Sequence, residues 1–317
     1  MPPISENTVS LIGRRLKLRD LQILLSVAQL GSMAKAASHL STTQPTVSQA
    51  IADLEAAVGV RLFDRSTQGV VPTSYGDILV KSALEAFDAL SYGMRSLEFA
   101  AASGAGDVRI GCGEITMYRL APALIQRLAQ SHPKITVHAV MVNPSDFAFR
   151  QLHERTLDLM IGVATHAGED LLIETLFEES FVVAVSAQSP WARRRKVELS
   201  ELMNEPWLYG EATNHTQARI SDRFRAMAGG LPHVAMFTTS MSLRLQLLGS
   251  GNYISCIPRS IYQYGRDHHQ LKALPIDMGL ELPIGLITLK NRTQSPAVNV
   301  FIEAARDVAK SMAADDH

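Results

Sequence analysis

The chain has 317 residues, of which 46% are hydrophobic, with a mean hydropathy of +0.06 and a formal net charge of −1. This length allows two or three domains with buried cores, and the composition is typical of a globular protein. The first residues lack the basic start and apolar run of a secretory signal, and no apolar stretch approaches the roughly 18 residues of a membrane span. We therefore expect neither export nor a membrane partner.

In chain order, the first strong pattern is a helix-turn-helix at residues 32–54. Ser32 is placed to cap a first helix, 41–43 form a polar turn, and Pro45 suits the first turn of a second helix. The expected buried positions of the two helices are Met33, Ala36, Ala37, Leu40, Val47, Ala50, Ile51, Leu54 and Val58. Short polar groups near the second helix's N-terminus lie where a recognition helix meets base edges and phosphates. We predict duplex DNA contacts from Thr43, Gln44, Pro45, Thr46, Ser48 and Gln49.

The flanks extend this pattern to a winged domain. Upstream, a helical stripe of Leu18, Leu21, Leu25 and Ala28 ends at Gly31. Downstream, 60–65 and 70–71 predict two short strands joined by a turn at 66–69. Arg65, at the base of this wing, is predicted to meet a phosphate or the minor groove. Residues 1–76 carry seven Lys or Arg and five Asp or Glu, a net +2 that leaves −3 for the rest.

Residues 18–79 resemble the N-terminal domain of LysR-type transcriptional regulators. The matching residues are Leu18, Leu21, Val27, Ala28, Gly31, Ser32, Ala36, Ala37, Leu40, Gln44, Pro45, Val47, Ser48, Ile51, Leu54, Glu55, Gly59, Leu62, Phe63, Arg65, Pro72, Thr73 and Gly76. Family members often carry a basic residue at the positions of Gln49 and Gln68, so phosphate contact or base preference is expected to differ here. The resemblance implies a cytoplasmic DNA-binding regulator whose partners are double-stranded promoter DNA and RNA polymerase.

After the wing, the sequence predicts a long helix that begins after Thr73 as N-cap. Its apolar residues recur at heptad spacing, which is typical of a helix that pairs with a second copy. The predicted dimer seam is Val80, Ala83, Phe87, Leu90, Met94 and Leu97. The resemblance agrees, since linker helices of the family pair between protomers and many members are tetramers. Residues 103–106, Ser-Gly-Ala-Gly, are interpreted as a hinge.

From Asp107, strands alternate with helices, which predicts parallel strands covered by helices. The first half is predicted to hold strands at 108–111, 135–141, 157–163 and 181–186, with helices at 116–129 and 146–155. The second half is predicted to hold strands at 207–208, 234–238, 253–257 and 286–289, and a final helix at 297–312. Two such lobes joined by crossing strands resemble the periplasmic-binding-protein fold, which is the family's effector-binding module.

The expected fold class is therefore multidomain: a helix-rich winged helix-turn-helix, a long linker helix and a two-lobed α/β effector domain. The expected bounds are 1–73 for DNA binding, 74–103 for the linker and 107–317 for the effector domain. Within the last, 107–180 and 281–317 form one lobe and 181–280 the other.

Ligands in such folds sit between the lobes, at helix N-termini beyond the strands. The predicted effector residues are Glu114, Ile115, Thr116, Ser145, Thr239 and Ser240. We expect a small polar or anionic metabolite and no cofactor. Each polar residue is also a plausible helix cap, and Glu114 argues against a bare carboxylate at its own helix end.

Other functions were weighed on the same residues. Cys112 and Cys256 each lie in an apolar strand-like run, which favours buried thiols over the closely spaced pair of a redox sensor. The cluster 267–269, Asp-His-His, lies in a polar, loop-like stretch without a companion metal ligand, so no metal site is expected. The Gly-x-Gly at 111–113 lacks the third glycine of a dinucleotide fold, so no enzyme is expected. A regulator that acts without an effector, or a solute-binding protein, stays open as an alternative.

Overall fold

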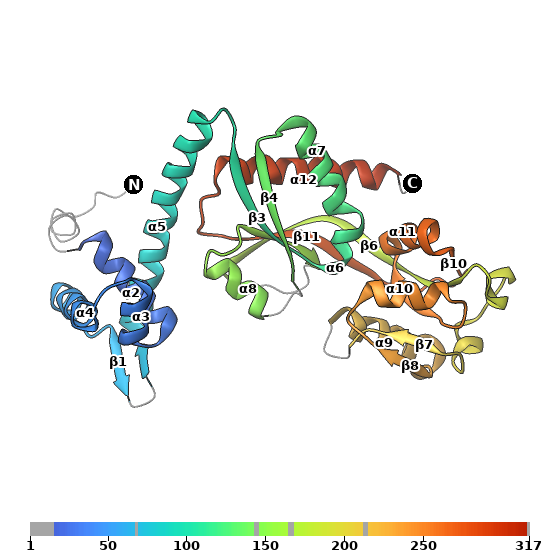
Figure 1. Ribbon diagram of the computed structural model, residues 1–317. Coiled ribbons are helices and arrows are strands. Elements are labelled where there is room, and N and C mark those ends of the chain that lie inside the picture. Colours follow the sequence, from blue (N-terminus) through green and yellow to red (C-terminus); the bar gives the residue numbers. More distant parts are fainter. Residues whose placement is uncertain (1–15, 67–68, 143–145, 164–167, 212–214, 316–317) are drawn as a thin grey trace. The chain divides into compact units, whose positions relative to one another are not determined.

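The computed structural model describes residues 16–66, 69–142, 146–163, 168–211 and 215–315 (Figure 1). The chain divides into two compact units, Met1–Met94 and Arg95–His317, and the boundary falls inside one long helix, α5. The predicted boundary at residue 73 lies at the start of that helix. The predicted boundary at residue 107 lies just after the loop that follows the helix. Each unit is described by itself.

The first unit is a three-helix domain with a two-stranded wing, as predicted. Its elements are α2 (Leu18–Leu30), α3 (Met33–His39), α4 (Gln44–Val58), β1 (Phe63–Ser66), β2 (Gly69–Pro72) and α5 (Ser74–Ala101). Gly31 ends α2 with φ +63°, a left-handed conformation that glycine adopts without strain. The hydroxyl of Ser32 accepts a hydrogen bond from Lys35 N and so caps α3. The predicted helix-turn-helix is confirmed.

A single apolar core holds these helices together. The buried face of α4, with Val47, Ile51 and Leu54, packs on the apolar faces of α2 and α3. Glu55 fastens the wing to α4, because its carboxylate accepts hydrogen bonds from the backbone N–H of Leu62 (2.7 Å) and Phe63 (3.3 Å). Thr73 caps α5 by accepting a hydrogen bond from Gly76 N at 3.1 Å. Because the buried face of α4 is fixed in this core, the opposite face of α4 is held toward the outside.

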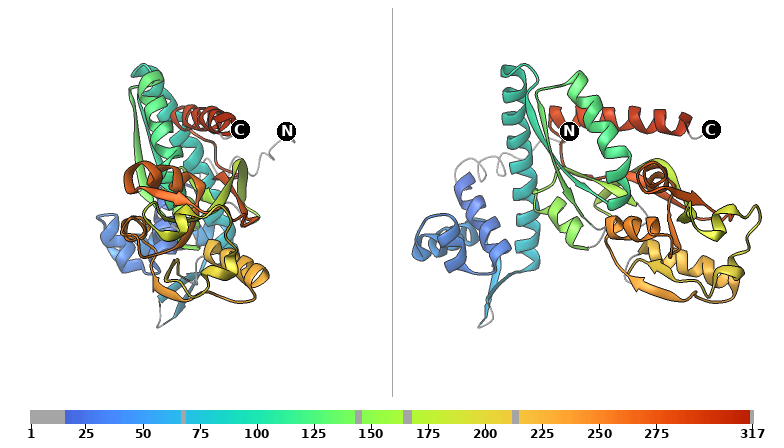
Figure 2. Two further views of the ribbon diagram at one scale, coloured as in Figure 1. Left: turned by 90° about the vertical axis from the view of Figure 1, so that its right-hand side faces the viewer. Right: turned by 45° about the vertical axis from the view of Figure 1, so that its right-hand side comes forward.

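The first lobe of the second unit is a mixed sheet with helices on both faces. Its strands are β3 (Gly106–Cys112), β4 (Ile135–Met141), β5 (Leu159–Val163), β6 (Leu171–Ser186) and β11 (Glu281–Leu289). Its helices are α6 (Glu114–Tyr118), α7 (Leu120–Ser131), α8 (Asp146–His153) and α12 (Pro296–Asp315). Helices α7 and α12 lie side by side and bury one apolar face of the sheet, and α8 packs on the other (Figures 1 and 2).

The second lobe is smaller and is built around the far end of β6. It contains two short 3-10 helices (Pro190–Arg193 and Leu199–Leu202), β7 (Trp207–Tyr209), α9 (His215–Ala228), β8 (Val234–Phe237), α10 (Met241–Gly249), β9 (Ser255–Pro258), α11 (Arg259–His269) and β10 (Leu271–Ala273). The sixteen residues of β6 pair with β11 in the first lobe and with β9 and β10 in the second. A continuous strand therefore connects the two lobes.

A buried ion-pair network lies at the amino end of β5. One Asp158 carboxylate oxygen accepts from Arg292 at 2.8 Å and from Arg95 at 3.3 Å, and the other accepts from Arg109 N at 2.9 Å. The side chains of Asp158 and Arg292 are each 3% exposed, and that of Arg95, at the end of α5, is 28% exposed. The last turns of the long helix are thereby fastened to the first lobe.

The structure corrects several expectations. Strands β3, β4 and β5 are parallel as predicted, but β11 inserts antiparallel between β5 and β6, so the sheet is mixed. The helix predicted at 116–129 is broken at Arg119 into α6 and α7. The stretch 267–269, expected as a loop, is the end of α11, where the His268 ring stacks on Tyr264 at 4.1 Å. Local polarity misled here because α11 buries only one narrow face.

Candidate functional site

The predicted DNA-contacting residues lie together at the N-terminus of α4. Thr43 is the N-cap, and its hydroxyl lies 3.4 Å from Thr46 N and 2.8 Å from the Thr46 hydroxyl. Gln44, Pro45 and Gln49 are exposed, and Thr46 and Ser48 are half-buried. The Gln49 amide donates one hydrogen bond to Asp53 at 2.8 Å, and its second N–H and its carbonyl oxygen remain available. Five polar side chains with free hydrogen-bonding capacity therefore share one helix end.

Arg65 extends from the wing. It lies on β1 opposite Val70 and is exposed, and no ion pair involves it within the part of the chain that the structure describes. The guanidinium is consequently available for an external anion such as a phosphate. Gln68, where the resemblance favours a basic residue, lies outside the described residues.

The predicted dimer seam divides into two halves along α5. Val80 and Ala83 pack into the core of the helix-turn-helix domain, and Ala83 is buried there. This half of the seam contributes to the core of the protomer itself, and Val80 stays half-buried there. Leu90, Met94 and Leu97 are 48%, 59% and 67% exposed. Three large apolar side chains at heptad spacing thus remain uncovered on one face, with the half-buried Phe87 at their N-terminal end.

Helix α6 bridges the two lobes of the second unit. The Glu114 carboxylate accepts a hydrogen bond from Met241 N, at the start of α10, at 2.8 Å. The Tyr118 and Ser242 hydroxyls lie 3.4 Å apart, and the Tyr118 ring packs edge-on against Tyr264 at 5.2 Å. Ile115 packs against the apolar cores of both lobes. The predicted effector residues Glu114 and Ile115 therefore hold the lobes in contact.

The other predicted effector residues have different surroundings. Thr116 is buried, and its hydroxyl donates to the Gly113 carbonyl at 2.8 Å, which is a structural role. Ser240 caps α10 by accepting from Leu243 N at 3.3 Å, and Thr239 is exposed beside it. Ser145 lies outside the described residues. Of the predicted set, the structure brings Glu114 and the 239–240 end of lobe II together.

Sequence reasoning missed a buried polar cluster in lobe II. Tyr209 at the end of β7, Gln217 near the start of α9 and Arg244 in α10 are 3%, 4% and 6% exposed. Gln217 accepts from Gly210 N at 2.7 Å, and Arg244 donates to the Thr238 carbonyl at 3.1 Å. The signal for Arg244 was present, because it is the one charge in the apolar run of α10, Met-Ser-Leu-Arg-Leu-Gln-Leu-Leu. It escaped notice because only the N-terminal end of this helix, at 239–240, was assigned to the site.

Glu114 and Arg244 carry the opposite charges of this region. Burial raises the pKa of Glu114 above its usual range, and this is opposed by the Met241 N–H and by Arg244. Burial lowers the pKa of the Arg244 guanidinium, and the nearby Glu114 carboxylate opposes that shift. Each group therefore stabilises the charged form of the other.

Both cysteines are buried free thiols, as predicted. Burial raises the pKa of Cys112 to about 11 and that of Cys256 to about 12. Both remain protonated at neutral pH, and the thiolate is the form that reacts with oxidants.

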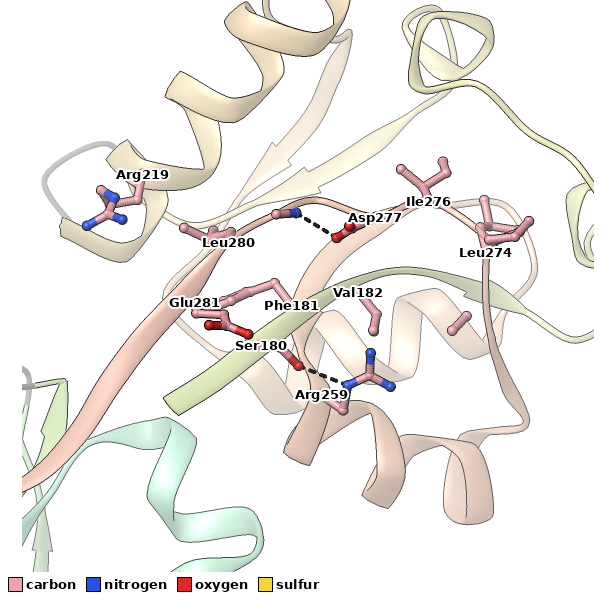
Figure 3. Close-up of a pocket in the computed structure, with 13 residues that line it drawn as sticks. Ser180, Phe181, Val182, Arg219, Arg259, Leu274, Ile276, Asp277, Leu280 and Glu281 are labelled. Atoms are coloured by element: carbon pink, nitrogen blue, oxygen red, sulfur yellow. Dashed lines mark hydrogen bonds between the residues drawn. The ribbon is translucent and has the colours of Figure 1, made fainter. Parts of the chain in front are cut away.

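A separate cavity of about 970 Å³ lies on lobe II, between β6, α9, the start of α11 and the segment 273–281 (Figure 3). Among its lining residues, Arg259 donates to the Ser180 hydroxyl, and Arg219, Asp277 and Glu281 add charges of both signs. Of the predicted effector residues that the structure describes, none lines it. Its open form and mixed charge select no ligand, so the bridged region at α6 and α10 is the stronger candidate site.

Comparison with known proteins gives matches over nearly the whole chain. The model of the "LysR substrate binding domain" matches residues 101–310, and that of the "Bacterial regulatory helix-turn-helix protein, lysR family" matches residues 18–77. The chain is 28% identical over 303 residues to the HTH-type transcriptional regulator YdcI of Escherichia coli, covering 94% of this chain and 97% of that protein.

Solved structures share the fold. A full-length variant of OxyR from Pseudomonas aeruginosa matches with a TM-score of 0.63 and 19% identity, covering 93% of this chain and 95% of that one. Full-length CbnR in complex with its target DNA matches with a TM-score of 0.54 and 22% identity, covering 93% of this chain and 100% of that one.

Proposed function

The chain belongs to the LysR family of bacterial helix-turn-helix regulators, and on this premise we propose that it binds promoter DNA as a dimer or tetramer and responds to a small-molecule effector between its two lobes. Membership makes it a DNA-binding transcriptional regulator with an effector-binding domain. The observation that carries the proposal is the cluster of polar side chains at the capped N-terminus of α4, whose opposite face is locked in the core.

The proposed DNA surface consists of two parts with different tasks. Thr43, Gln44, Pro45, Thr46, Ser48 and Gln49 are the residues proposed to lie in the major groove. Side chains that reach base edges carry sequence information, whereas contacts to phosphates set position. Arg65 on the wing is proposed to contact the backbone or the minor groove. The DNA complex of CbnR, which shares the fold, supports duplex DNA as the partner.

The proposed assembly uses the exposed half of the α5 seam, and residues 74–103 are its linker. Leu90, Met94 and Leu97 would be covered by the same face of a second copy, since a heptad stripe of this kind is too apolar to leave in water. Residues 1–73 form the proposed DNA-binding domain and 107–317 the effector domain. We also propose that it acts in the cytoplasm with RNA polymerase and uses no cofactor. No helix among the described residues is long and apolar enough to cross a membrane.

We expect Ser48→Ala and Gln49→Ala to relax base preference. A side chain that makes a good base contact contributes about 1–3 kcal/mol of discrimination against the wrong base. Arg65→Gln is expected to weaken binding to all sequences alike and to reduce the salt dependence of binding by roughly one counterion. Fluorescence anisotropy with promoter DNA and with single-base variants, each at several salt concentrations, measures both effects.

Gln246→Ala, an exposed position on α10, serves as the control and should leave DNA binding unchanged. Unaltered discrimination and affinity in the triple variant of Ser48, Gln49 and Arg65 would show that another surface contacts DNA.

A further inference from the structure

We propose that the effector is a small oxyanion, such as a carboxylate, that binds at the N-terminus of α10. In the absence of the effector, the Glu114 carboxylate occupies this position. The proposal rests on the proposed effector function and names the chemical class of the ligand and the group it displaces. Three features of the bridged region carry it: a helix end that already holds a carboxylate, a set of unpaired buried donors, and the local charge balance.

The N-terminus of α10 binds a carboxylate from the other lobe. The first N–H groups of a helix have no partner within the helix and attract anions. Two of these N–H groups in α10 have acceptors: the Leu243 N–H donates to the Ser240 hydroxyl, and the Met241 N–H donates to the Glu114 carboxylate at 2.8 Å. Glu114 is 127 residues away in sequence and reaches α10 from the first lobe. The position is therefore built for an anionic oxygen, and in this conformation the chain supplies it.

Beside this helix end, lobe II holds buried donors that lack an acceptor. Tyr209 Oη, Gln217 Nε2 and Arg244 Nε are buried without a hydrogen-bond partner among the described residues. Gln217 and Arg244 meet at Gly210, where a side-chain carbon would lie 3.0 Å from Gln217 Oε1 and 3.2 Å from Arg244 Nη2. An unmade hydrogen bond of a buried group is costly, so donors left in this state favour a partner that brings acceptors. A group with several acceptor oxygens would satisfy Gln217 and Arg244 together, because these two side chains meet at Gly210.

The charges favour an anion over a cation. Arg244 is a permanently charged guanidinium in a buried position. The Glu114 carboxylate is the acidic group whose field acts on it. A cationic ligand would add a second positive charge beside Arg244, whereas an oxyanion would take over the role of the Glu114 carboxylate. An oxyanion and Glu114 thus compete for the same positive field.

The Glu114 carboxylate can be displaced from the N-terminus of α10. Its side chain is half-buried, it has freely rotating bonds, and its attachment to α10 is a single hydrogen bond between lobes. Displacing it would remove one of the contacts by which α6 bridges the lobes, while the contacts of Tyr118 with Ser242 and Tyr264 remain. Because the ligand would bind only the state in which Glu114 has left, it shifts the population toward that state. Ligand binding and lobe contact are linked through this one carboxylate.

The test compares anion binding by the full-length wild type, Glu114→Gln and Glu114→Asp. Acetate and sulfate are titrated by calorimetry at constant ionic strength, with ethylammonium chloride as the cationic probe. A tethered competitor lowers apparent affinity by the fraction of time that it leaves the site free. We expect both variants to bind acetate or sulfate with a dissociation constant about tenfold lower than the wild type. The shorter aspartate provides a second variant that keeps the charge but cannot reach Met241 N.

Glu178→Gln is the matched control, since it removes an equal charge at an exposed position on β6. It should bind the anions as the wild type does. Arg244→Gln in the Glu114→Gln background should abolish the gain. Unchanged or weaker anion binding in both Glu114 variants, or no anion binding by any protein, overturns the proposal. So does ethylammonium binding that is lost with Glu114. Anion binding that follows the expected order but never alters promoter affinity would uphold the anion site and reject the effector function.

Discussion

Replacing Leu90 and Met94 together by glutamate is expected to convert the assembled protein into a monomer and to lower promoter affinity roughly 100- to 10,000-fold. Both side chains are exposed on α5 at heptad spacing, where a second copy of the helix would cover them. Glutamate keeps the helix, because its helix propensity is high, but it places unpaired charges in an apolar seam. Loss of pairing removes the second recognition helix from the complex, and with it the gain from binding two half-sites at once.

Light scattering gives the mass, and anisotropy with a complete promoter site gives the affinity. The matched control is Ser82→Glu with Ala89→Glu, which adds the same two charges, also on exposed positions of α5 but off the heptad seam. This control should keep the mass and the affinity of the wild type. If the seam variant is also unchanged in both measurements, pairing does not depend on α5.

Replacing Asp158 by alanine is expected to destabilise the second unit by about 3–5 kcal/mol. The carboxylate lies between the guanidinium groups of Arg292 and Arg95, and it also accepts from Arg109 N. Removing it leaves the buried Arg292 charge without its carboxylate, although Arg292 keeps its hydrogen bond to the Leu157 carbonyl, and it leaves the Arg109 N–H without this acceptor. Such losses far exceed those of exposed ion pairs, which contribute about 0–1 kcal/mol.

Urea unfolding of the full chain, followed by circular dichroism, measures this loss for the transition of residues 95–317. Asp222→Asn is the control, since it breaks an exposed pair with Arg225 on α9 and should change the free energy of unfolding little. If Asp158→Ala lowered the free energy of unfolding as little as Asp222→Asn does, water rather than Asp158 would solvate Arg292. Because Arg95 belongs to the same network, Asp158→Ala should also loosen the end of α5 from the first lobe, which faster hydrogen exchange in 95–101 would report.

The helix-turn-helix unit could be predicted from sequence almost in full. Its elements are specified by neighbours: Gly31 ends one helix, Ser32 and Thr43 cap the next two, and the apolar positions recur at helical spacing. These signals act over three or four residues, so they survive without knowledge of the rest of the fold. Once the apolar positions of α4 were assigned to its buried face, the remaining polar positions had to lie on its outer face. The same reasoning placed α5 and the parallel strands β3, β4 and β5.

What remained hidden depends on residues that are distant in sequence. The occupation of Val80 and Ala83 by their own domain could not be distinguished from pairing between copies, because both produce the same apolar stripe on α5. The insertion of β11 between β5 and β6 brings together strands more than 90 residues apart, and strand order leaves no local trace.

The region where α6 meets α10 shows most clearly what sequence and what tertiary structure each determine. Sequence by itself determined that polar residues follow the strands, and so that Glu114 and Ser240 stand at helix N-termini. Only the tertiary structure decided that Glu114 caps the helix of the other lobe and that Gln217 and Arg244 are buried beside Gly210. The reason is physical: a cap within one helix is a contact between near neighbours, whereas a carboxylate that meets a helix end 127 residues away depends on how two lobes pack.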